Sequence, residues 1–298
     1  MVYIIAILIV FFPVACALVF SIFYFKRLKR GRRSPISGNL LRGPGESLRE
    51  ELEKNLEHLE NCYFRNLITT LPPVALLLIF KWLNSNIVTT WQLGIVAVLY
   101  AFLLFWSIRK LIFVIKERRN LFLGLDAEIA VGQELNHLML DGVRIFHDFP
   151  AENFNIDHIA ISPGGVFAVE TKGRAKPDNG GGKADALIIF DGKRLTFPGW
   201  FEIEPLAQAK RQAEWLSKWL SSAVGETVAV TGVVVLPGWY IDRKGAGDVK
   251  VLSGKEIYHL KKMNVSRLTP EMIQRIAHQV EQRCRNVEPA AYRKDKKK

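Results

Sequence analysis

The stretch "IDHIAISPGGVFAVETKG", residues 156–173, contains two apolar runs on either side of Ser162-Pro163-Gly164-Gly165. Serine, proline and glycine between such runs are typical of a tight turn that joins two β-strands. Apolar residues occupy both faces of this expected hairpin, which is typical of central strands covered by helices on both sides. They are Ile156, Ile159, Ala160, Ile161, Val166, Phe167, Ala168 and Val169. Charged residues in such strands therefore require an explanation.

Three charged residues lie at the open end of this hairpin. With a two-residue turn at Pro163 and Gly164, antiparallel pairing puts Asp157 directly opposite Glu170, with their Cβ atoms about 5 Å apart. Lys172 follows two residues later and emerges on the same face as Glu170. Two carboxylates at that distance repel each other and lose hydration when buried, which costs several kcal/mol or protonates one of them.

A divalent cation would remove this conflict. The carboxylates of Asp157 and Glu170, the backbone carbonyl of Thr171 and water molecules are hard oxygen ligands that suit Mg²⁺ or Mn²⁺. Lys172 could then orient or help deprotonate a water on the metal while the metal offsets charge on a phosphate. The pattern thus favours phosphodiester hydrolysis.

Two alternatives stay open for these residues. The turn could be a three-residue loop with a glycine bulge, which would shift the register and send the two acids to opposite faces. Lys172 could also form a plain ion pair with one acid at the end of a strand.

The chain from about residue 120 predicts a mixed α/β domain around this hairpin. Helical periodicity and β-rich runs alternate along it, with turn residues between them. The expected helices cover 125–140, 205–221 and 270–285, and the expected strands cover 143–149, 227–237 and 249–253, with a small hairpin around Asp191-Gly192. A polar, glycine-rich insertion occupies residues 173–185.

The 298-residue chain is 49% hydrophobic, which predicts that part of it lies in lipid. Residues 2–25 carry no charge, and a helix of about 24 residues crosses a bilayer. A cleaved signal peptide is the rival interpretation, but the basic residues follow this run, at 26–33, instead of preceding it.

Two further apolar regions, 67–82 and 93–115, predict a transmembrane helical hairpin. Its first arm contains Pro72, Pro73 and Lys81, so an interfacial or re-entrant segment is the alternative. Basic clusters lie outside the loop between the two arms, so the positive-inside rule puts everything after residue 116 in the cytoplasm. The expected location is the bacterial inner membrane, with several spans.

The charge and the remaining segments suggest partners. A net charge of +12 suits a polyanion, either nucleic acid or an anionic lipid bilayer. Residues 45–64 predict an amphipathic helix that packs near the membrane or in a dimer, so a homo-oligomer is possible. The three cysteines lie far apart in sequence and form no metal-binding pattern, as expected in a reducing cytoplasm.

The motifs I-D-H at 156–158 and E-T-K at 170–172, on either side of S-P-G-G, resemble the signature of the nuclease-related domain, NERD, of the PD-(D/E)xK nuclease superfamily. The resemblance covers roughly residues 124–252 and includes the "HDF" strand and a V-x-x-x-L-x-x-L helix. It implies a restriction-endonuclease-like mixed sheet flanked by helices, and a divalent-metal-dependent nuclease.

The resemblance adds two residues to the site. The family's glutamate before V-x-x-x-L-x-x-L falls on Glu128, and a helical wheel at about 100° per residue turns Glu128 inward more than Glu134. Glu128 is therefore the fourth expected metal ligand. The family's active-site glutamine falls on Gln208, where it would hold a phosphate or water; an exposed helical glutamine is the alternative.

The sequence also departs from the family pattern. Ala127-Glu128 replaces the usual Gly-Glu, and the glycine-rich insertion after Lys172 is longer than the common form. His158 resembles the family's histidine after the aspartate, but in a regular strand its side chain faces away from Asp157.

Two functions follow as expectations. The first is a membrane-anchored nuclease acting on DNA or RNA, with Glu128, Asp157, Glu170, Lys172 and Gln208 at the site. The second is a catalytically inactive nucleic-acid-binding or scaffold module tethered to the membrane. The expected domains are a first transmembrane helix (1–25), a basic linker with an amphipathic helix (26–66), a transmembrane hairpin (67–119), the nuclease-like domain (120–265), and a C-terminal helix with a basic tail (266–298).

Overall fold

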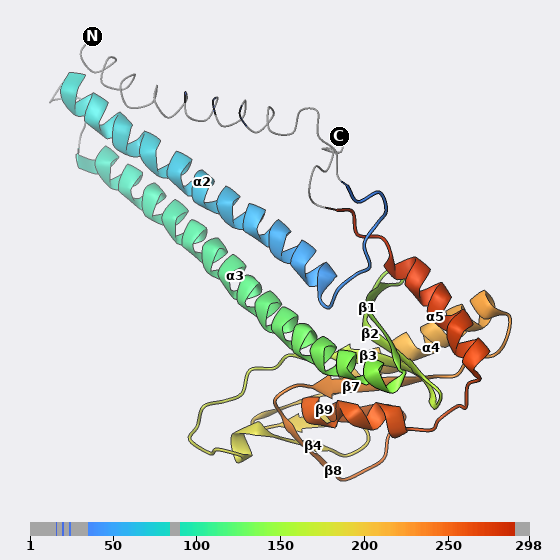
Figure 1. Cartoon of the computed structure of the whole chain (residues 1–298). Helices are drawn as coiled ribbons and strands as arrows, with labels where there is room; N and C mark the ends of the chain where they lie inside the picture. Colours follow the sequence, from blue (N-terminus) through green and yellow to red (C-terminus); the bar gives the residue numbers. More distant parts are fainter. Residues whose placement is uncertain (1–15, 17–19, 21–23, 25–34, 84–89, 290–298) are drawn as a thin grey trace. The chain divides into compact units, whose positions relative to one another are not determined.

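The computed structural model describes residues 35–83 and 90–289, together with Cys16, Phe20 and Tyr24 (Figure 1). It divides into two compact units, one of Met1–Leu41 with Arg285–Lys298 and one of Arg42–Cys284. In the first unit, Leu40 and Val287 form an antiparallel bridge. The second unit contains every residue of the expected site. Apart from the three single residues, the expected first span at 1–25 lies outside the described residues.

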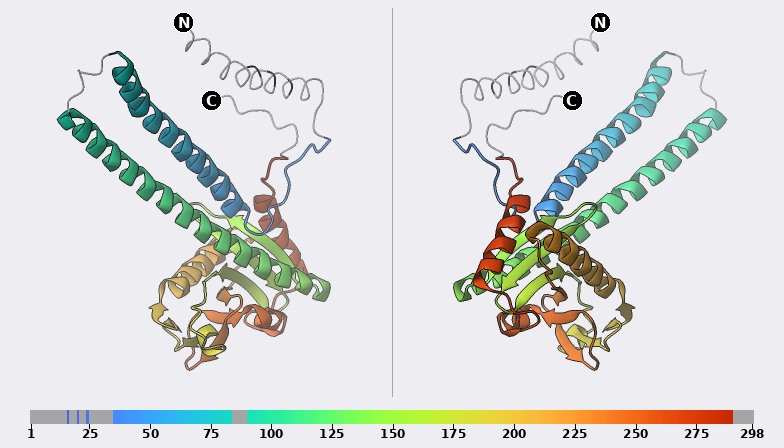
Figure 2. Two further views of the ribbon diagram at one scale, coloured as in Figure 1. Left: turned by 90° about the vertical axis from the view of Figure 1, so that its left-hand side faces the viewer. Right: turned by 90° about the vertical axis from the view of Figure 1, so that its right-hand side faces the viewer.

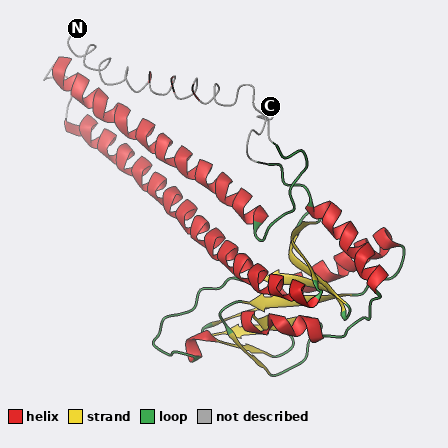
Figure 3. Cartoon of the chain, in the orientation of Figure 1, coloured by secondary structure: helices red, strands yellow, loops and turns green. Residues whose placement is uncertain are grey.

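A five-stranded mixed sheet forms the centre of the second unit (Figure 3). Its strands stand in the order β1-β2-β3-β7-β9. They are β1 (Arg144–Pro150), β2 (Asn155–Ser162), β3 (Gly165–Thr171), β7 (Val230–Leu236) and β9 (Lys250–Ser253). The first three strands pair antiparallel, and β3, β7 and β9 pair parallel. The predicted mixed sheet of an α/β fold is confirmed.

The β2–β3 hairpin has the predicted register. Ser162 pairs with Gly165 and His158 pairs with Val169, so Pro163 and Gly164 are the two turn residues. The carbonyl of Gly164 accepts hydrogen bonds from the backbone N–H groups of Val265 and Ser266, at 2.8 and 3.1 Å. The turn is therefore held by the segment that leads into α5.

Helices cover both faces of the sheet (Figure 2). One face packs against α4 (Glu204–Val224) and α5 (Pro270–Cys284). The other packs against the end of α3 (Thr90–His137) and the 3₁₀ helix η3 (Gly254–Lys262). This two-sided cover explains why the central strands are apolar on both faces.

A second, four-stranded sheet packs against β7, β9 and α4 through a further hydrophobic core. Its order is β6-β5-β4-β8, with β4 (Leu187–Phe190), β5 (Leu195–Phe197), β6 (Trp200–Glu202) and β8 (Tyr240–Arg243). The β4–β5 hairpin is the one predicted around Asp191-Gly192. The sequence did not predict β6 or β8, which extend that hairpin into a sheet.

Two long helices, α2 (Glu46–Leu83) and α3, lie side by side (Figures 1 and 2). The helix predicted at 125–140 is not separate: it is the end of α3, followed by the short 3₁₀ helix η1 (Leu138–Asp141). Gly142 then ends the helical segment with a φ of 82°, a conformation that glycine adopts without strain.

The expectation of transmembrane spans at 67–82 and 93–115 is not supported. In the part of the chain that the structure describes, no helix combines the length and the apolar character needed to cross a bilayer. The basic residues Arg109 and Lys110 lie within the second of these two stretches, in α3.

Candidate active site

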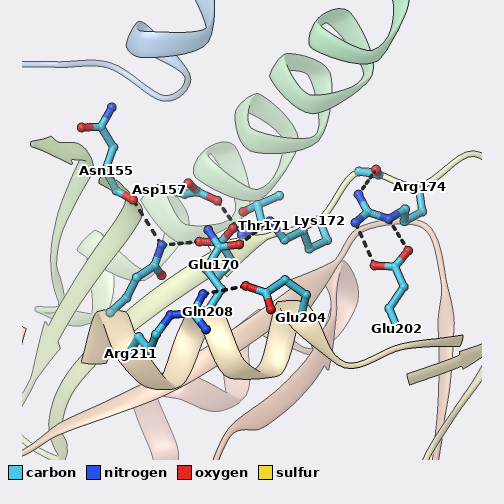
Figure 4. Close-up of polar contacts among 12 residues, drawn as sticks. Asn155, Asp157, Glu170, Thr171, Lys172, Arg174, Glu202, Glu204, Gln208 and Arg211 are labelled. Carbon is cyan, nitrogen blue, oxygen red and sulfur yellow. Dashed lines mark hydrogen bonds and ion pairs between the residues drawn. The ribbon is translucent and has the colours of Figure 1, made fainter. Parts of the chain in front are cut away.

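The acid pair lies where β2 and β3 meet the N-terminal end of α4 (Figure 4). Asp157 and Glu170 follow the alternation of Ile159 and Ala168, so they belong to the sheet face that α4 covers. Oδ2 of Asp157 accepts a hydrogen bond from the backbone N–H of Thr171 at 2.6 Å. Burial raises the pKa of Asp157 well above its usual range, and the charges of Glu170 and Glu128 raise it further.

Glu170 is only 2% exposed and is held on both oxygens. Its Oε1 lies 2.6 Å from Nζ of Lys172, and its Oε2 accepts a 2.6 Å hydrogen bond from Nε2 of Gln212. Nζ of Lys172 also donates to Oε1 of Gln208 at 3.0 Å. The structure thus brings Asp157, Glu170, Lys172 and Gln208 into one polar cluster, within which the plain Lys172–Glu170 ion pair is present.

Gln212 is a site residue that the sequence did not predict. It lies one helical turn after Gln208 on α4, is buried, and bridges Glu170 to the carbonyl of Asn155, which accepts at 3.2 Å. Residues four apart on a helix share a face. The spacing of Gln208 and Gln212 was therefore the signal that could have revealed it.

Glu128 reaches the cluster from α3, on the other side of the sheet. It is 9% exposed whereas Glu134 is exposed, so the predicted inward orientation is confirmed. Burial raises the pKa of Glu128 to about 8, and the charges of Asp148 and Glu170 also raise it. Its Oε2 is buried and has no hydrogen-bond partner.

The segment before α2 borders Glu128, a contact that the sequence did not predict. Asp148, buried on β1 with a φ of 48°, pairs with Nη2 of Arg42 at 2.6 Å and accepts from the backbone N–H of Ser47 at 2.8 Å. The hydroxyl of Ser47 donates to the same carboxylate. A Cβ on Gly45 would lie 3.6 Å from Oε2 of Glu128. This segment therefore forms one wall of the site.

His158 lies on the other face of the sheet, as predicted. Its Nδ1 is 2.9 Å from Nδ1 of His147, whose Nε2 is 3.0 Å from Oδ1 of Asn136 on α3. Burial lowers the pKa of His147 to about 4 and that of His158 well below its usual range. Both imidazoles are therefore neutral near pH 7 and separated from the acid pair by the sheet.

The cluster offers hard oxygen atoms but no closed ring of side-chain ligands. Among the described residues, no three His, Cys, Asp or Glu side chains form a group that could by itself hold a metal ion. Three buried polar atoms in this region lack hydrogen-bond partners: Oε2 of Glu128, Oγ1 of Thr171 and Oε1 of Gln212. Unpartnered buried oxygens of this kind are unusual and call for a ligand or water.

One of three comparisons with known proteins found a match. A search of curated proteins and a search of solved structures each found no match to the chain. The family model described as "Nuclease-related domain", NERD, matches residues 123–237, a range that includes Glu128, Asp157, Glu170, Lys172, Gln208 and Gln212. Residues 123–237 of this chain therefore match a nuclease-related domain.

Proposed function

We propose that this domain is a divalent-metal-dependent nuclease that hydrolyses phosphodiester bonds of DNA or RNA. The observation that supports this most is the acid pair: Asp157 and Glu170 share one sheet face, with Nζ of Lys172 2.6 Å from Glu170. Carboxylates that neighbouring strands bring together, with a lysine beside them, suit reactions in which negative charge develops on a phosphate. The nuclease-related match over these residues supports the same chemistry.

Mg²⁺ or Mn²⁺ fits the oxygen atoms of this cluster. Asp157, Glu170 and the backbone carbonyl of Thr171 would hold the ion, with water completing the shell and joining it to Glu128, since no three acidic side chains of the described residues form a metal-holding group by themselves. Burial raises the pKa values of Asp157 and Glu128, and the charge of Glu170 raises both further. This crowding of buried acids and the unpartnered Oε2 of Glu128 support a cation there. When bound, the ion supplies positive charge that stabilises the phosphate as the ester bond breaks.

The other polar residues position these groups. Gln212 donates a hydrogen bond to Glu170 from α4. Gln208 and Glu170 together hold the ammonium of Lys172. An ammonium paired with a carboxylate has hydrogen bonds to donate and none to accept. Lys172 therefore orients water or a phosphate oxygen at the reaction centre.

The decisive experiment is cleavage by the purified full chain. Plasmid, linear DNA and structured RNA are incubated with Mg²⁺ or Mn²⁺, beside the Asp157→Asn variant. We expect metal-dependent cleavage that falls by about 100-fold or more in the variant, because the metal loses a charged ligand. Glu134→Gln, an exposed position of α3, is the matched control and should cleave normally. The absence of cleavage in either metal would instead favour a catalytically inactive binding module.

We also propose, from the sequence, that the chain attaches to a lipid bilayer with the nuclease-related domain on the cytoplasmic side. Apart from Cys16, Phe20 and Tyr24, the uncharged run at 2–25 lies outside the described residues. The middle of α3 exposes large apolar side chains, among them Phe102, Phe105, Trp106 and Phe113. Recovery of the full chain in the soluble fraction of lysed cells, free of vesicles, would contradict this attachment.

A further inference from the structure

The chain that leaves the site runs along the edge of the second sheet. Two residues after Lys172, the guanidinium of Arg174 forms two hydrogen bonds with Glu202 of β6, at 2.7 and 2.8 Å. Nε1 of Trp239 donates to the carbonyl of Arg174 at 3.2 Å. Figure 4 shows Arg174 and Glu202 beside Lys172. The segment from Lys172 to Lys176 therefore links the acid pair to β6.

An exposed tryptophan is fixed at this edge. The ring of Trp200 stacks on Phe197 with centroids 4.6 Å apart and planes 3° apart, and Trp239 meets Phe197 edge-on at 5.2 Å. Nε1 of Trp200 donates to Glu202 at 3.1 Å. The ring is nevertheless 36% exposed, on an edge strand. Phe197 covers one face of Trp200, Trp239 approaches it edge-on with centroids 6.2 Å apart, and about a third of the residue meets solvent.

Charged side chains lie between the Trp200 ring and the acid pair. The pKa of Glu202 is lowered: burial alone would raise it, but the hydrogen bonds from Arg174 and Trp200 and the charges of Arg174 and Lys172 outweigh burial. Glu202 offsets the charge of Arg174, whereas Lys176 is exposed, with its ammonium 6.0 Å from the ring centroid of Trp239. A phosphate backbone that follows this edge would meet Lys176 first and Lys172 at the acid pair.

We propose that the edge formed by Lys176 and Trp200, which the Arg174–Glu202 pair holds in place, binds single-stranded nucleic acid and guides it to the acid pair. The inference rests on the proposed nuclease function and narrows its substrate class. Unpaired bases stack on exposed aromatic rings, and basic side chains follow the phosphates. In a duplex the base faces are already stacked on one another, so Trp200 would add nothing to its binding.

The test is equilibrium binding by the full chain in chelator, where no cleavage occurs. Fluorescein-labelled oligothymidylate, oligouridylate and a duplex of about 20 base pairs are titrated, and fluorescence anisotropy gives the dissociation constants. Single strands should bind more tightly than the duplex. Trp200→Ala should weaken single-strand binding about tenfold with an unchanged salt dependence, and Trp200→Phe should retain most of the affinity. The two single strands distinguish DNA from RNA.

Matched variants separate stacking from charge and from misfolding. Phe201 lies on the opposite face of β6 and is more exposed, at 59%, so Phe201→Ala should bind as the unmodified chain does. Lys176→Ala should reduce the slope of log K against log salt by about 0.7. The proposal would be overturned if Trp200→Ala and Phe201→Ala lost equal affinity for single strands. It would also be overturned if the chain bound the duplex more tightly and Trp200→Ala did not change that preference.

The same measurements distinguish this proposal from the proposed function. Trp200-dependent binding of single strands without any metal-dependent cleavage would leave the binding edge standing and remove the nuclease assignment. If cleavage depends on Asp157 but Trp200→Ala binds single strands as tightly as the unmodified chain does, the nuclease assignment stands and the binding edge is removed.

Discussion

At the scale of single residues, Glu128 couples protonation to the stability of the fold. Its pKa is about 8 in the folded chain against a usual value of 4.5. Between these pH values the folded state keeps a proton that the unfolded state has lost, so this contribution to the free energy of unfolding is present below about pH 4.5 and is lost as pH rises towards 8. Asp157, whose pKa is also raised, acts in the same direction.

The corresponding prediction concerns Glu128→Gln in chelator. Urea unfolding at several pH values should show a free energy of unfolding that falls less steeply between about pH 5 and 8 than in the unmodified chain, because one proton no longer titrates. Glu134→Gln, exposed on the same helix, should keep the original slope. An unchanged slope in Glu128→Gln would show that Glu128 is already ionised in the fold.

The two glutamines of α4 should differ in what they stabilise. Gln212→Ala leaves the buried Oε2 of Glu170 without its donor, which should lower the free energy of unfolding by about 1–3 kcal/mol. Gln208 is only half-buried, so Gln208→Ala should cost less than about 1 kcal/mol while still disturbing Lys172. Urea unfolding of both variants tests this difference, and equal costs would contradict it.

The site was predictable where it depends on local pairing. Turn length and strand alternation place Asp157 opposite Glu170, and helical periodicity turns Glu128 inward. Neither rule predicts the hydrogen bond between Arg42 and Asp148, which joins residues 106 positions apart in sequence. Contacts of that kind depend on how whole elements pack, so the wall beside Glu128 could not be read from the sequence.

At the scale of elements, the turn of the β2–β3 hairpin is set by close packing. A Cβ on Gly164 would lie 1.9 Å from the carbonyl oxygen of Met263, so no other residue fits there without movement of the backbone. The two-residue turn and its clamp together hold the register. A shift by one residue would turn Asp157 away from Glu170.

Gly164→Ala should therefore lower the free energy of unfolding by at least about 2 kcal/mol, as expected for overpacking against backbone. Gly38→Ala is the matched control, because no atom lies within 4 Å of the added Cβ and the backbone is ordinary there. Thermal and urea unfolding of both variants provide the measurement. A Gly164→Ala chain as stable as Gly38→Ala would show that the segment at residues 263–268 yields easily.

The second sheet shows where prediction from pattern ends. The β4–β5 hairpin joins neighbouring segments and was predicted, whereas β8 pairs with β4 from about fifty residues further along the chain. β6 has only the residues Trp200–Glu202, too few for an alternating pattern to be recognised. The proposed single-strand edge lies on β6, so it became visible only from the assembled sheet.

At the scale of the whole molecule, the connection between the helical pair and the nuclease-related domain differs from expectation. The sequence predicted a hairpin ending near residue 119 and a new helix near 125, whereas α3 continues through both. Apolar periodicity reports which side of a helix is buried, but it does not report whether two successive helical patterns share one axis. Between Lys116 and Leu125 the sequence has a single glycine, Gly124, and no proline, and α3 continues through this glycine.

This continuity gives α3 the properties of a lever. Glu128 lies near one end of the helix, about 57 Å along its axis from Thr90 at the other. A slight tilt or axial rotation of the outer turns would be transmitted along the helix to Glu128, whose charge acts on Asp157. A partner that binds the Thr90 end of α3 would therefore influence the position of Glu128 relative to the acid pair.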